Sequence, residues 1–317
     1  MKIVILESKA VNPGDLSWDV IKAFGDVAIY DRTPAEEAAA HIGDAEVVLI
    51  NKTPITAEVM DKCPNLRLVC VEATGYNVVD CEAARARNIL VCNVPAYSTN
   101  CVAQFTFALL LEACCHVGLH NDSVHHGDWC RNPDFCYWLT PQMELAGKTI
   151  GIIGFGKIGR AVGKIANAFG MRVLAYNRSR CPEGEVLGEY VSLDRLLAES
   201  DVISLHCPMT EQTANIINRN SISKMKDGAI LINTARGGLI NEAELAQALQ
   251  QGKLRAYAAD VVSEEPILQS NPLLTAPNCI LTPHMAWAPV EARQRIIDIT
   301  VQNIQGYLNG TPVNVVN

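Results

Sequence analysis

The feature that most constrains the fold is an apolar strand followed at once by three spaced glycines. Residues Thr149–Ile153 suit a buried strand, and residues 154–159 read Gly-Phe-Gly-Lys-Ile-Gly before a helical pattern begins. In a strand–turn–helix of this kind, Gly154 permits the tight turn, Gly156 the close approach of a pyrophosphate, and Gly159 the contact between helix and strand. The N–H groups of the first helical turn then face the anion. The motif predicts a dinucleotide-binding α/β unit; the alternative is an ordinary turn with incidental glycines.

Strand and helix patterns alternate along the whole chain. Strands are expected at Lys2–Leu6, Val47–Ile50, Leu68–Val71, Ile89–Cys92, Thr149–Ile153, Arg172–Tyr176, Val202–Leu205, Ala229–Asn233, Ala256–Asp260 and Cys279–Leu281. Helices are expected between them, among others at Leu16–Phe24, Ala57–Lys62, Cys81–Arg87 and Glu291–Leu308. Such alternation predicts βαβ units with parallel sheets. Because 317 residues exceed what one core usually serves, we expect two doubly wound, Rossmann-like α/β domains.

The middle of the chain departs from this alternation. A long helix is expected at Val102–Cys115, and because it is apolar almost all round we expect it to be buried. From residue 116 to residue 147 no clear period remains, which predicts an irregular arm or lid. Its aromatic side chains need cover, which a partner subunit could provide. We expect His125 and His126 in this arm to be solvated.

Composition excludes several classes of protein. Net charge is −8, from 26 basic and 34 acidic residues without a basic stripe, which argues against nucleic acid as a partner. The 12 cysteines include several inside apolar runs and no CxxC pair, which favours reduced thiols in a cytoplasmic protein. The first strand is too short for a signal peptide, and the apolar run near Phe105–Leu111 is too short for a membrane span. No His, Cys and carboxylate set has metal-ligand spacing, so no metal is expected.

The residues after the strand at 172–176 bear on the choice of dinucleotide. An acidic residue there would favour NAD, but Asn177 is neutral and Arg178 and Arg180 are cationic, a combination that suits the extra phosphate of NADP. A charge-assisted contact corresponds to a roughly ten- to hundred-fold preference. We therefore expect NADPH to be favoured over NADH; the alternative is that both arginines point to solvent.

Three charged residues follow strand ends in the second half of the chain: Arg236, Glu265 and His284. The carboxyl ends of strands line the ligand crevice of an open α/β sheet, so these side chains could converge there. Reduction of a ketone by hydride needs a proton donor, for which histidine titrates in the right range. A carboxylate would orient the imidazole, and an arginine would hold a substrate carboxylate. The alternative is that all three are unrelated surface residues.

Two further strand ends carry candidate residues. His206 follows a strand and either lines an adenosine pocket or has a structural role. In the first domain, Ala73–Tyr76 follow the strand at 68–71, and their backbone N–H groups could form an anion nest. Because the first domain lacks a glycine-rich phosphate loop, it is better suited to bind substrate than nucleotide.

Taken together, these segments resemble the D-isomer-specific 2-hydroxyacid dehydrogenases over nearly the whole chain. The resemblance is carried by Thr74–Asp80, Gly154–Gly159, His206–Pro208, Asn233–Gly238 and Thr282–Pro289. It implies that His284 is the acid/base, that Glu265 is its partner, and that Arg236 binds the substrate carboxylate.

The resemblance also implies a wider set of contacts. Substrate contacts would come from Ala73, Thr74, Gly75, Tyr76, Arg236 and His284. Cofactor contacts would come from Gly154, Phe155, Gly156, Lys157, Ile158, Gly159, Asn177, Arg178, Ser179, His206, Cys207, Pro208, Thr213, Thr234, Ala235, Arg236, Asp260, His284 and Ala286. The family's domain order implies a substrate domain at 1–98 and 287–317 around an inserted NAD(P)-binding domain at 99–286. An arm at about 117–148 would join two copies in a homodimer.

A narrower likeness points to the glycerate dehydrogenases and hydroxypyruvate reductases. It is carried by the loop at 74–80, by Val102–Gln104 and by His284–Pro289. It implies NAD(P)H-dependent reduction of hydroxypyruvate or glyoxylate to D-glycerate or glycolate. Lactate-type, aryl 2-keto acid and phosphoglycerate substrates stay open, as does a dinucleotide-sensing, corepressor-like binding protein. Asn177 departs from the NAD-using members of the family.

Overall fold

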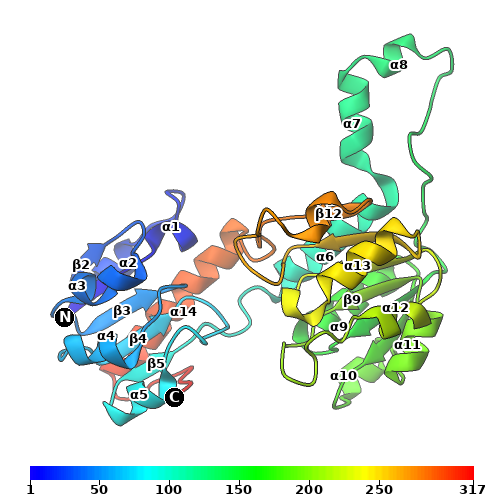
Figure 1. Cartoon of the computed structure of the whole chain (residues 1–317). Coiled ribbons are helices and arrows are strands. Elements are labelled where there is room, and N and C mark those ends of the chain that lie inside the picture. Colours follow the sequence, from blue (N-terminus) through cyan, green and yellow to red (C-terminus); the bar gives the residue numbers. More distant parts are fainter. The chain divides into compact units, whose positions relative to one another are not determined.

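The computed structural model describes all residues from 1 to 317, which form two compact units (Figure 1). Met1–Ser98 and Trp287–Asn317 build one, called here the terminal unit, and Thr99–Ala286 build the other, the central unit. Each contains a single sheet in which all paired strands run parallel. The predicted α/β class with two Rossmann-like sheets is therefore confirmed.

The sheet of the terminal unit has five strands in the order β2-β1-β3-β4-β5. Their bounds are β1 Lys2–Ile5, β2 Asp26–Ile29, β3 Val47–Ile50, β4 Leu68–Val71 and β5 Leu90–Cys92. β3 and β4 are buried at every residue, because a parallel strand under helices on both faces has no face toward water. β2 lies at an edge and is largely exposed; it was not predicted, although Val27–Tyr30 form an apolar run.

Helices cover both faces of this sheet. Their bounds are α1 Ser8–Val11, α2 Asp19–Lys22, α3 Ala38–Ile42, α4 Ala57–Lys62, α5 Cys81–Ala86 and α14 Val290–Leu308, with a 3-10 turn at Ala35–Glu37. Residues of α3, α4 and α5 share one core cluster with Val69 and Val71 of β4, whereas α14, which also packs on β4, contributes none. Side chains alternate along a strand, so Cys70 and Glu72 point to the face that α14 covers. The helix predicted at 16–24 is a single turn, α2.

The last residues of the chain lie beside β5, at the edge of this sheet (Figure 1). Val315 forms an antiparallel bridge with Cys92, and the Val316 N–H donates to the Val91 carbonyl at 2.9 Å. The side chain of Asn317 accepts from the Val91 N–H at 2.9 Å and donates to the Ile89 carbonyl at 2.7 Å. The tail thus satisfies backbone groups that an edge strand would otherwise leave open.

The central unit has a seven-stranded sheet in the order β12-β11-β10-β9-β6-β7-β8. Its strands are β6 Thr149–Ile153, β7 Arg172–Tyr176, β8 Glu189–Tyr190, β9 Val202–Leu205, β10 Ala229–Asn233, β11 Leu254–Ala259 and β12 Cys279–Leu281. The chain order runs outward in opposite directions from β6, through β7 on one side and β9 on the other. That reversal is a topological switch point, where open α/β sheets bind ligands outside the carboxyl ends of their strands.

Two helical layers enclose this sheet. The helices are α6 Thr99–Cys115, α7 Val117–His125, α8 Asp128–Arg131, α9 Lys157–Ala168, α10 Pro182–Glu185, α11 Leu193–Glu199, α12 Arg219–Lys224 and α13 Glu242–Gln250, with 3-10 turns at Gly237–Leu239 and Pro272–Thr275. α11, α12 and α13 share one apolar core with the sheet, and α6 and α9 share the other. The predicted burial of α6 is confirmed: Leu110, Ala113 and Cys114 have no exposed surface.

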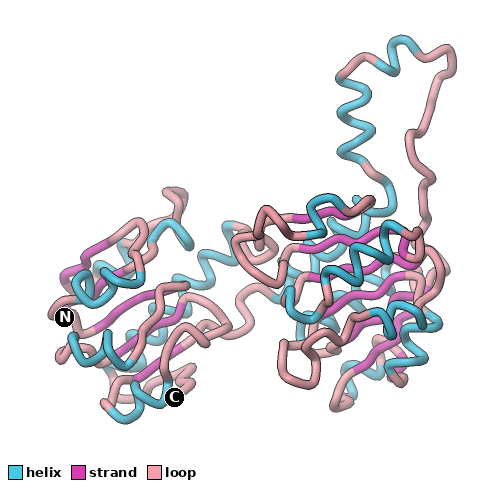
Figure 2. The backbone as a smooth tube through the Cα atoms, viewed as in Figure 1, coloured by secondary structure: helices cyan, strands magenta, loops and turns pink.

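The arm at 117–148 extends away from the sheet of the central unit (Figures 1 and 2). The prediction that it is irregular is wrong in part, because it contains α7 and α8 before an extended return. Only Ser123 is buried in α7, so this helix has no apolar stripe from which a period could be recognised. His125 and His126 are exposed, as predicted. No single helix has the length and composition to cross a membrane; only α6 and α7 taken together do, and they are bent by 58°.

Candidate active site

The glycine loop between β6 and α9 is shaped by its neighbours. Gly154 has φ +95°, and a Cβ on it would lie 2.3 Å from the Cys207 backbone nitrogen. A Cβ on Gly159 would lie 2.2 Å from the Gly154 carbonyl oxygen, so both positions exclude any side chain. A Cβ on Gly156 would meet nothing within 4 Å, and no side chain caps the first turn of α9. Open space over uncapped N–H groups fits a pyrophosphate.

The loop after β7 carries the two predicted cations, Arg178 and Arg180. The Asn177 amide donates to the Ser179 carbonyl at 2.8 Å and shapes the turn. Arg178 is exposed and makes no ion pair, whereas the Arg180 guanidinium lies 5.7 Å from the centroid of the Tyr190 ring. Arg178 is therefore the freer of the two predicted cations. Sequence reasoning missed Arg160 in α9, whose guanidinium donates to Cys181 Sγ at 3.3 Å; its place right after the last glycine of the motif was the available signal.

The segment after β9 closes over the glycine loop. His206 Nε2 lies 2.8 Å from Ser204 Oγ, and desolvation lowers the pKa of His206 to about 3, so its ring is neutral. Thr213 Oγ1 donates to the Pro208 carbonyl at 2.7 Å and accepts from the Thr210 N–H at 2.8 Å. Thr213 thus stabilises the loop that carries Cys207. The backbone of Cys207 lies next to Gly154.

Arg236 stands on a loop held from below by Asn233, the last residue of β10. The fully buried Asn233 side chain accepts from the Ala235 N–H and donates to the Arg236 carbonyl, both at 3.0 Å. A Cβ on Gly237 would lie 1.9 Å from the Val262 carbonyl carbon, so this loop touches the one that leads to Glu265. The Arg236 side chain is exposed and makes no ion pair; Nη1 donates only to the Ala235 carbonyl, at 2.7 Å.

Thr234 connects this loop to α6. Its Oγ1 lies 3.0 Å from Oγ1 of Thr106, a fully buried residue of α6 that also hydrogen-bonds the Val102 carbonyl.

His284 and Glu265 form a close polar pair. His284 Nδ1 lies 2.6 Å from Glu265 Oε2, and the two side chains are 32% and 37% exposed. Glu265 Oε1 accepts from the Val262 N–H at 3.3 Å. His284 adopts φ +53°, which turns the chain sharply after β12. With Nδ1 held by a carboxylate, Nε2 is the nitrogen through which the ring can exchange a proton with a ligand.

Asp260, at the end of β11, anchors the loop that carries His284. The residue is only 1% exposed. Oδ1 accepts from Thr282 Oγ1 at 2.6 Å and from the Met285 N–H at 2.9 Å, and Oδ2 accepts from the Ala286 N–H at 2.7 Å. Its cofactor contact stays a prediction; the anchoring role was missed, since its donors lie 22–26 residues further along the chain.

The predicted substrate loop lies in the terminal unit, after β4. The Ala73 carbonyl accepts from the Val94 N–H at 3.0 Å, and Thr74 Oγ1 donates to the Val94 carbonyl at 3.0 Å. The Asn93 amide donates to the Thr74 carbonyl at 2.8 Å, whereas Tyr76 is exposed. All the other predicted site residues lie in the central unit.

Comparison with known proteins accords with this geometry. The chain matches the family model of the D-isomer specific 2-hydroxyacid dehydrogenase NAD binding domain over residues 107–286. It is 54% identical over 321 residues to a hydroxypyruvate reductase of Blautia hydrogenotrophica, with 100% of both chains covered. It is 42% identical over 283 residues to a glycerate dehydrogenase of Methylorubrum extorquens, covering 89% of this chain and 88% of the relative.

A solved structure is similar over its whole length. The acyclic imino acid reductase Bsp5, in complex with NADPH and D-Arg, superposes with a TM-score of 0.86 at 32% identity, with 100% of both chains covered.

Proposed function

The chain belongs to the D-isomer-specific 2-hydroxyacid dehydrogenase family, and on that premise we propose that it reduces hydroxypyruvate or glyoxylate with NAD(P)H. The products are D-glycerate and glycolate. The observation that carries the proposal is the 2.6 Å contact of His284 Nδ1 with Glu265 Oε2, beside the loop that presents Arg236. A proton donor and a carboxylate-binding cation on adjacent loops are what reduction of a 2-keto acid requires.

The residues divide the chemistry as follows. When bound, the dinucleotide supplies the hydride. His284 donates the proton of Nε2 to the carbonyl oxygen as negative charge develops there, and Glu265 stabilises the imidazolium from which that proton leaves. Arg236 can offer paired N–H groups to the substrate carboxylate because its guanidinium is exposed and makes no ion pair. From the family resemblance, the backbone of Ala73–Tyr76 is proposed as a further substrate contact.

The dinucleotide contacts are proposed at the carboxyl ends of β6, β7, β9 and β10. The open space over Gly156 and the uncapped start of α9 support a pyrophosphate position there. Arg178 supports a preference for NADPH, because no acidic partner competes for its guanidinium.

The test is a steady-state comparison of hydroxypyruvate, glyoxylate, pyruvate and phenylpyruvate with both nicotinamide cofactors, followed by chiral analysis of the product. We expect the highest kcat/KM with hydroxypyruvate or glyoxylate, and D-glycerate from hydroxypyruvate. Best activity on phenylpyruvate would reject the substrate class. Absence of turnover on every keto acid would favour the corepressor-like alternative.

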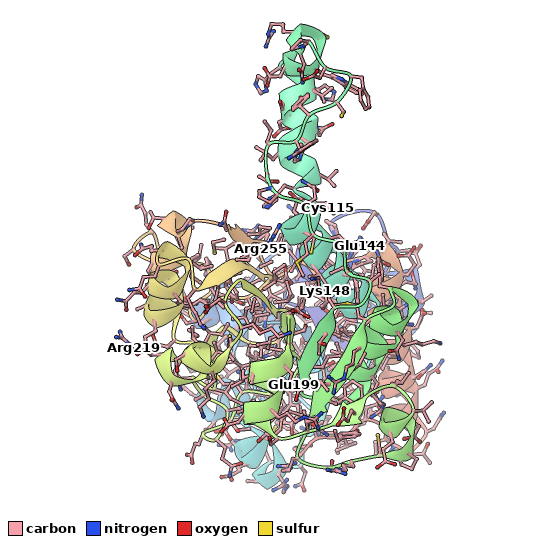
Figure 3. All side chains as sticks on the ribbon, turned by 90° about the vertical axis from the view of Figure 1, so that its right-hand side faces the viewer. Cys115, Glu144, Lys148, Glu199, Arg219 and Arg255 are labelled. Atoms are coloured by element: carbon pink, nitrogen blue, oxygen red, sulfur yellow. The ribbon has the colours of Figure 1, made fainter.

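We also propose that the enzyme is a homodimer joined through the arm. Phe135, Trp138 and Trp129 are 88%, 70% and 51% exposed, more than a monomer ordinarily leaves to water for three aromatic side chains. Figure 3 shows the arm projecting from the central unit above Cys115 and Arg255, and Arg255 hydrogen-bonds the Pro141 carbonyl at its base. An apolar groove of about 570 Å³ between α6 and α9 offers a second surface, lined by Phe107, Leu111 and Phe169 among others.

Light scattering of the wild type and of the double variant Phe135→Ser/Trp138→Ser tests the dimer. We expect a dimer that the double variant converts to a monomer, and a monomeric wild type would contradict it. A cytoplasmic location belongs to the same proposal, supported by 12 cysteines that are all free thiols.

A further inference from the structure

Glu72 is a buried carboxyl group with no protein partner. It follows β4 directly and has 0% exposed surface, yet neither carboxyl oxygen has a hydrogen-bond partner. It points to the face of the sheet that α14 covers, and on α14 the hydroxyl of Thr300 is likewise buried and unpartnered. Buried polar groups in folded proteins are nearly always hydrogen-bonded, so two exceptions on facing elements are unusual.

No cation compensates Glu72. The one buried cation of α14, Arg293, donates to both carboxylate oxygens of Asp15, at 2.7 and 2.6 Å, and to the carbonyls of Val11 and Ala288. Its charge and donors are therefore already committed within the terminal unit.

The other titratable groups around Glu72 do not help either. After β1 stands Glu7, whose Oε2 accepts from the backbone N–H groups of Asn51, Lys52 and Thr53 at 2.7–2.8 Å. Cys70 on β4 and its register partner Cys92 on β5 are buried thiols; burial raises the pKa of Cys70 well above its usual value and that of Cys92 to about 11. The surroundings thus offer a second carboxyl group and two neutral thiols.

These surroundings favour the uncharged acid. Burial first and the charge of Glu7 second raise the pKa of Glu72 to about 8 from its usual 4.5. At neutral pH the side chain accordingly holds its proton, and an ionised form would leave a buried charge without compensation.

The loop Ala73–Tyr76 begins directly after Glu72, whose backbone is held by two hydrogen bonds. The Glu72 N–H donates to the Ile50 carbonyl at 2.7 Å, and its own carbonyl accepts from the Asn51 amide at 3.0 Å. The next residues are held by Asn93 and Val94, as described above. A charged Glu72 side chain can reach water only if the Glu72 backbone moves. Such a movement would also displace the hydrogen bonds of Ala73 and Thr74.

We infer that Glu72 is a positioning residue whose uncharged carboxyl keeps the loop Ala73–Tyr76 in its binding form, and whose ionisation in alkaline solution releases that loop. The inference rests on the proposed function, because the loop Ala73–Tyr76 is a substrate contact only under that proposal. Glu72 acts through the loop backbone and leaves the proton transfer at His284 unchanged. Its signature is a rise in KM for the keto acid without a matching change in kcat.

The first experiment compares the wild type with Glu72→Gln, which keeps the size of the side chain and cannot ionise. KM for hydroxypyruvate is measured from about pH 6 to about pH 9.5. We expect the ratio of the wild-type KM to the KM of the variant to rise by up to about tenfold for each pH unit above the Glu72 pKa. The control is Glu58→Gln, the same change at an exposed carboxylate of α4, which should follow the wild type. Parallel KM profiles for the wild type and Glu72→Gln would overturn the inference.

The second experiment does not depend on turnover. Hydrogen exchange of the Glu72 and Val94 amides, which donate to the Ile50 and Ala73 carbonyls, is corrected for intrinsic rates and followed at about pH 7 and about pH 9. We expect protection in the wild type to fall at least about tenfold at the higher pH, and no such fall in Glu72→Gln. Equal protection of the wild type at both values, or the same loss in the variant, would overturn the inference.

The two experiments separate this inference from the proposed function. If no keto acid is turned over, the proposed function fails, and exchange alone decides the role of Glu72. If Glu72→Gln does not fold, Glu72→Leu, which also cannot ionise, takes its place in both measurements.

Discussion

Two buried carboxyl groups, Asp260 in the central unit and Glu72 in the terminal unit, occupy comparable places. Each directly follows the carboxyl end of a parallel strand, and their residues are 1% and 0% exposed. Asp260 accepts three hydrogen bonds from the loop that carries His284, whereas Glu72 accepts none. The same functional group at the same kind of position is thus a hydrogen-bonded anchor in one sheet and an uncharged acid without a partner in the other. The number of donors that the fold supplies decides which.

The largest effect on kcat is expected at His284, which lies on the loop that Asp260 anchors. His284→Ala should lower kcat by at least ~100-fold, because the proposed proton donor is lost. Glu265→Gln should also lower kcat, since the imidazolium loses its carboxylate. The matched control is Glu264→Gln, a change at the exposed neighbouring acid, which should leave kcat unchanged. Unchanged turnover in His284→Ala would reject its role.

Asp260→Asn tests the hydrogen-bonded member of the comparison. The amide places an NH₂ group where Oδ2 now faces the Ala286 N–H, so two donors oppose one another. We expect the free energy of unfolding to fall by about 2–4 kcal/mol and kcat to fall at least about tenfold as the His284 loop shifts. Denaturant unfolding and steady-state rates measure the two effects. Asp227→Asn, at an exposed carboxylate of the same unit, is the control; equal stability of the two variants would contradict the anchoring role.

Glu72→Gln should increase the free energy of unfolding, whereas Asp260→Asn should decrease it. The folded-state pKa of Glu72, about 8, lies above its usual 4.5, so the folded protein binds the extra proton between these values. Wild-type stability should therefore fall by up to about 1.4 kcal/mol for each pH unit from about 4.5 to about 8, and Glu72→Gln should lack this contribution. Near pH 8 the variant should have a higher Tm than the wild type, and near pH 5 this advantage should vanish. A Tm difference that does not change with pH would contradict the assignment.

Arg178→Ala extends the comparison to a charge that stands in water. Because its guanidinium makes no ion pair, the substitution should leave Tm unchanged. It should lower kcat/KM with NADPH by about ten- to hundred-fold and spare kcat/KM with NADH. The control is Arg219→Ala, at an exposed arginine of α12. Equal loss with both cofactors, or a wild type that uses NADH as well as NADPH, would remove the proposed preference.

The sheets could be predicted from sequence because most of their strands are buried on both faces. β3, β4, β6, β7, β9, β10 and β12 have the expected bounds, since an apolar run between turn residues marks such strands. The two-residue edge strand β8 was missed because it shows no such run, whereas β2 was missed although Val27–Tyr30 are apolar. The helices of the arm were missed for a related reason, since neither packs an apolar stripe against a core.

The site could be predicted only as far as single strand ends. Arg236, Glu265 and His284 were selected because each follows a strand, and the family resemblance named their proposed roles. The hydrogen-bond donors around Asp260, and the lack of such donors around Glu72, depend on residues far away in sequence, such as Ala286 and Arg293. No local pattern encodes how many hydrogen-bond donors a buried carboxyl group will meet.

The tail beside β5 has a consequence for synthesis on the ribosome. α14 and residues 315–317, which complete the terminal unit, are translated after the central unit, whereas Thr99–Ala286 form a contiguous stretch. A nascent chain can therefore complete the central unit while the first 98 residues still lack their covering helix and their edge partner. During that interval the uncovered β-sheet is the part of the polypeptide most exposed to aggregation, and a chaperone would act there.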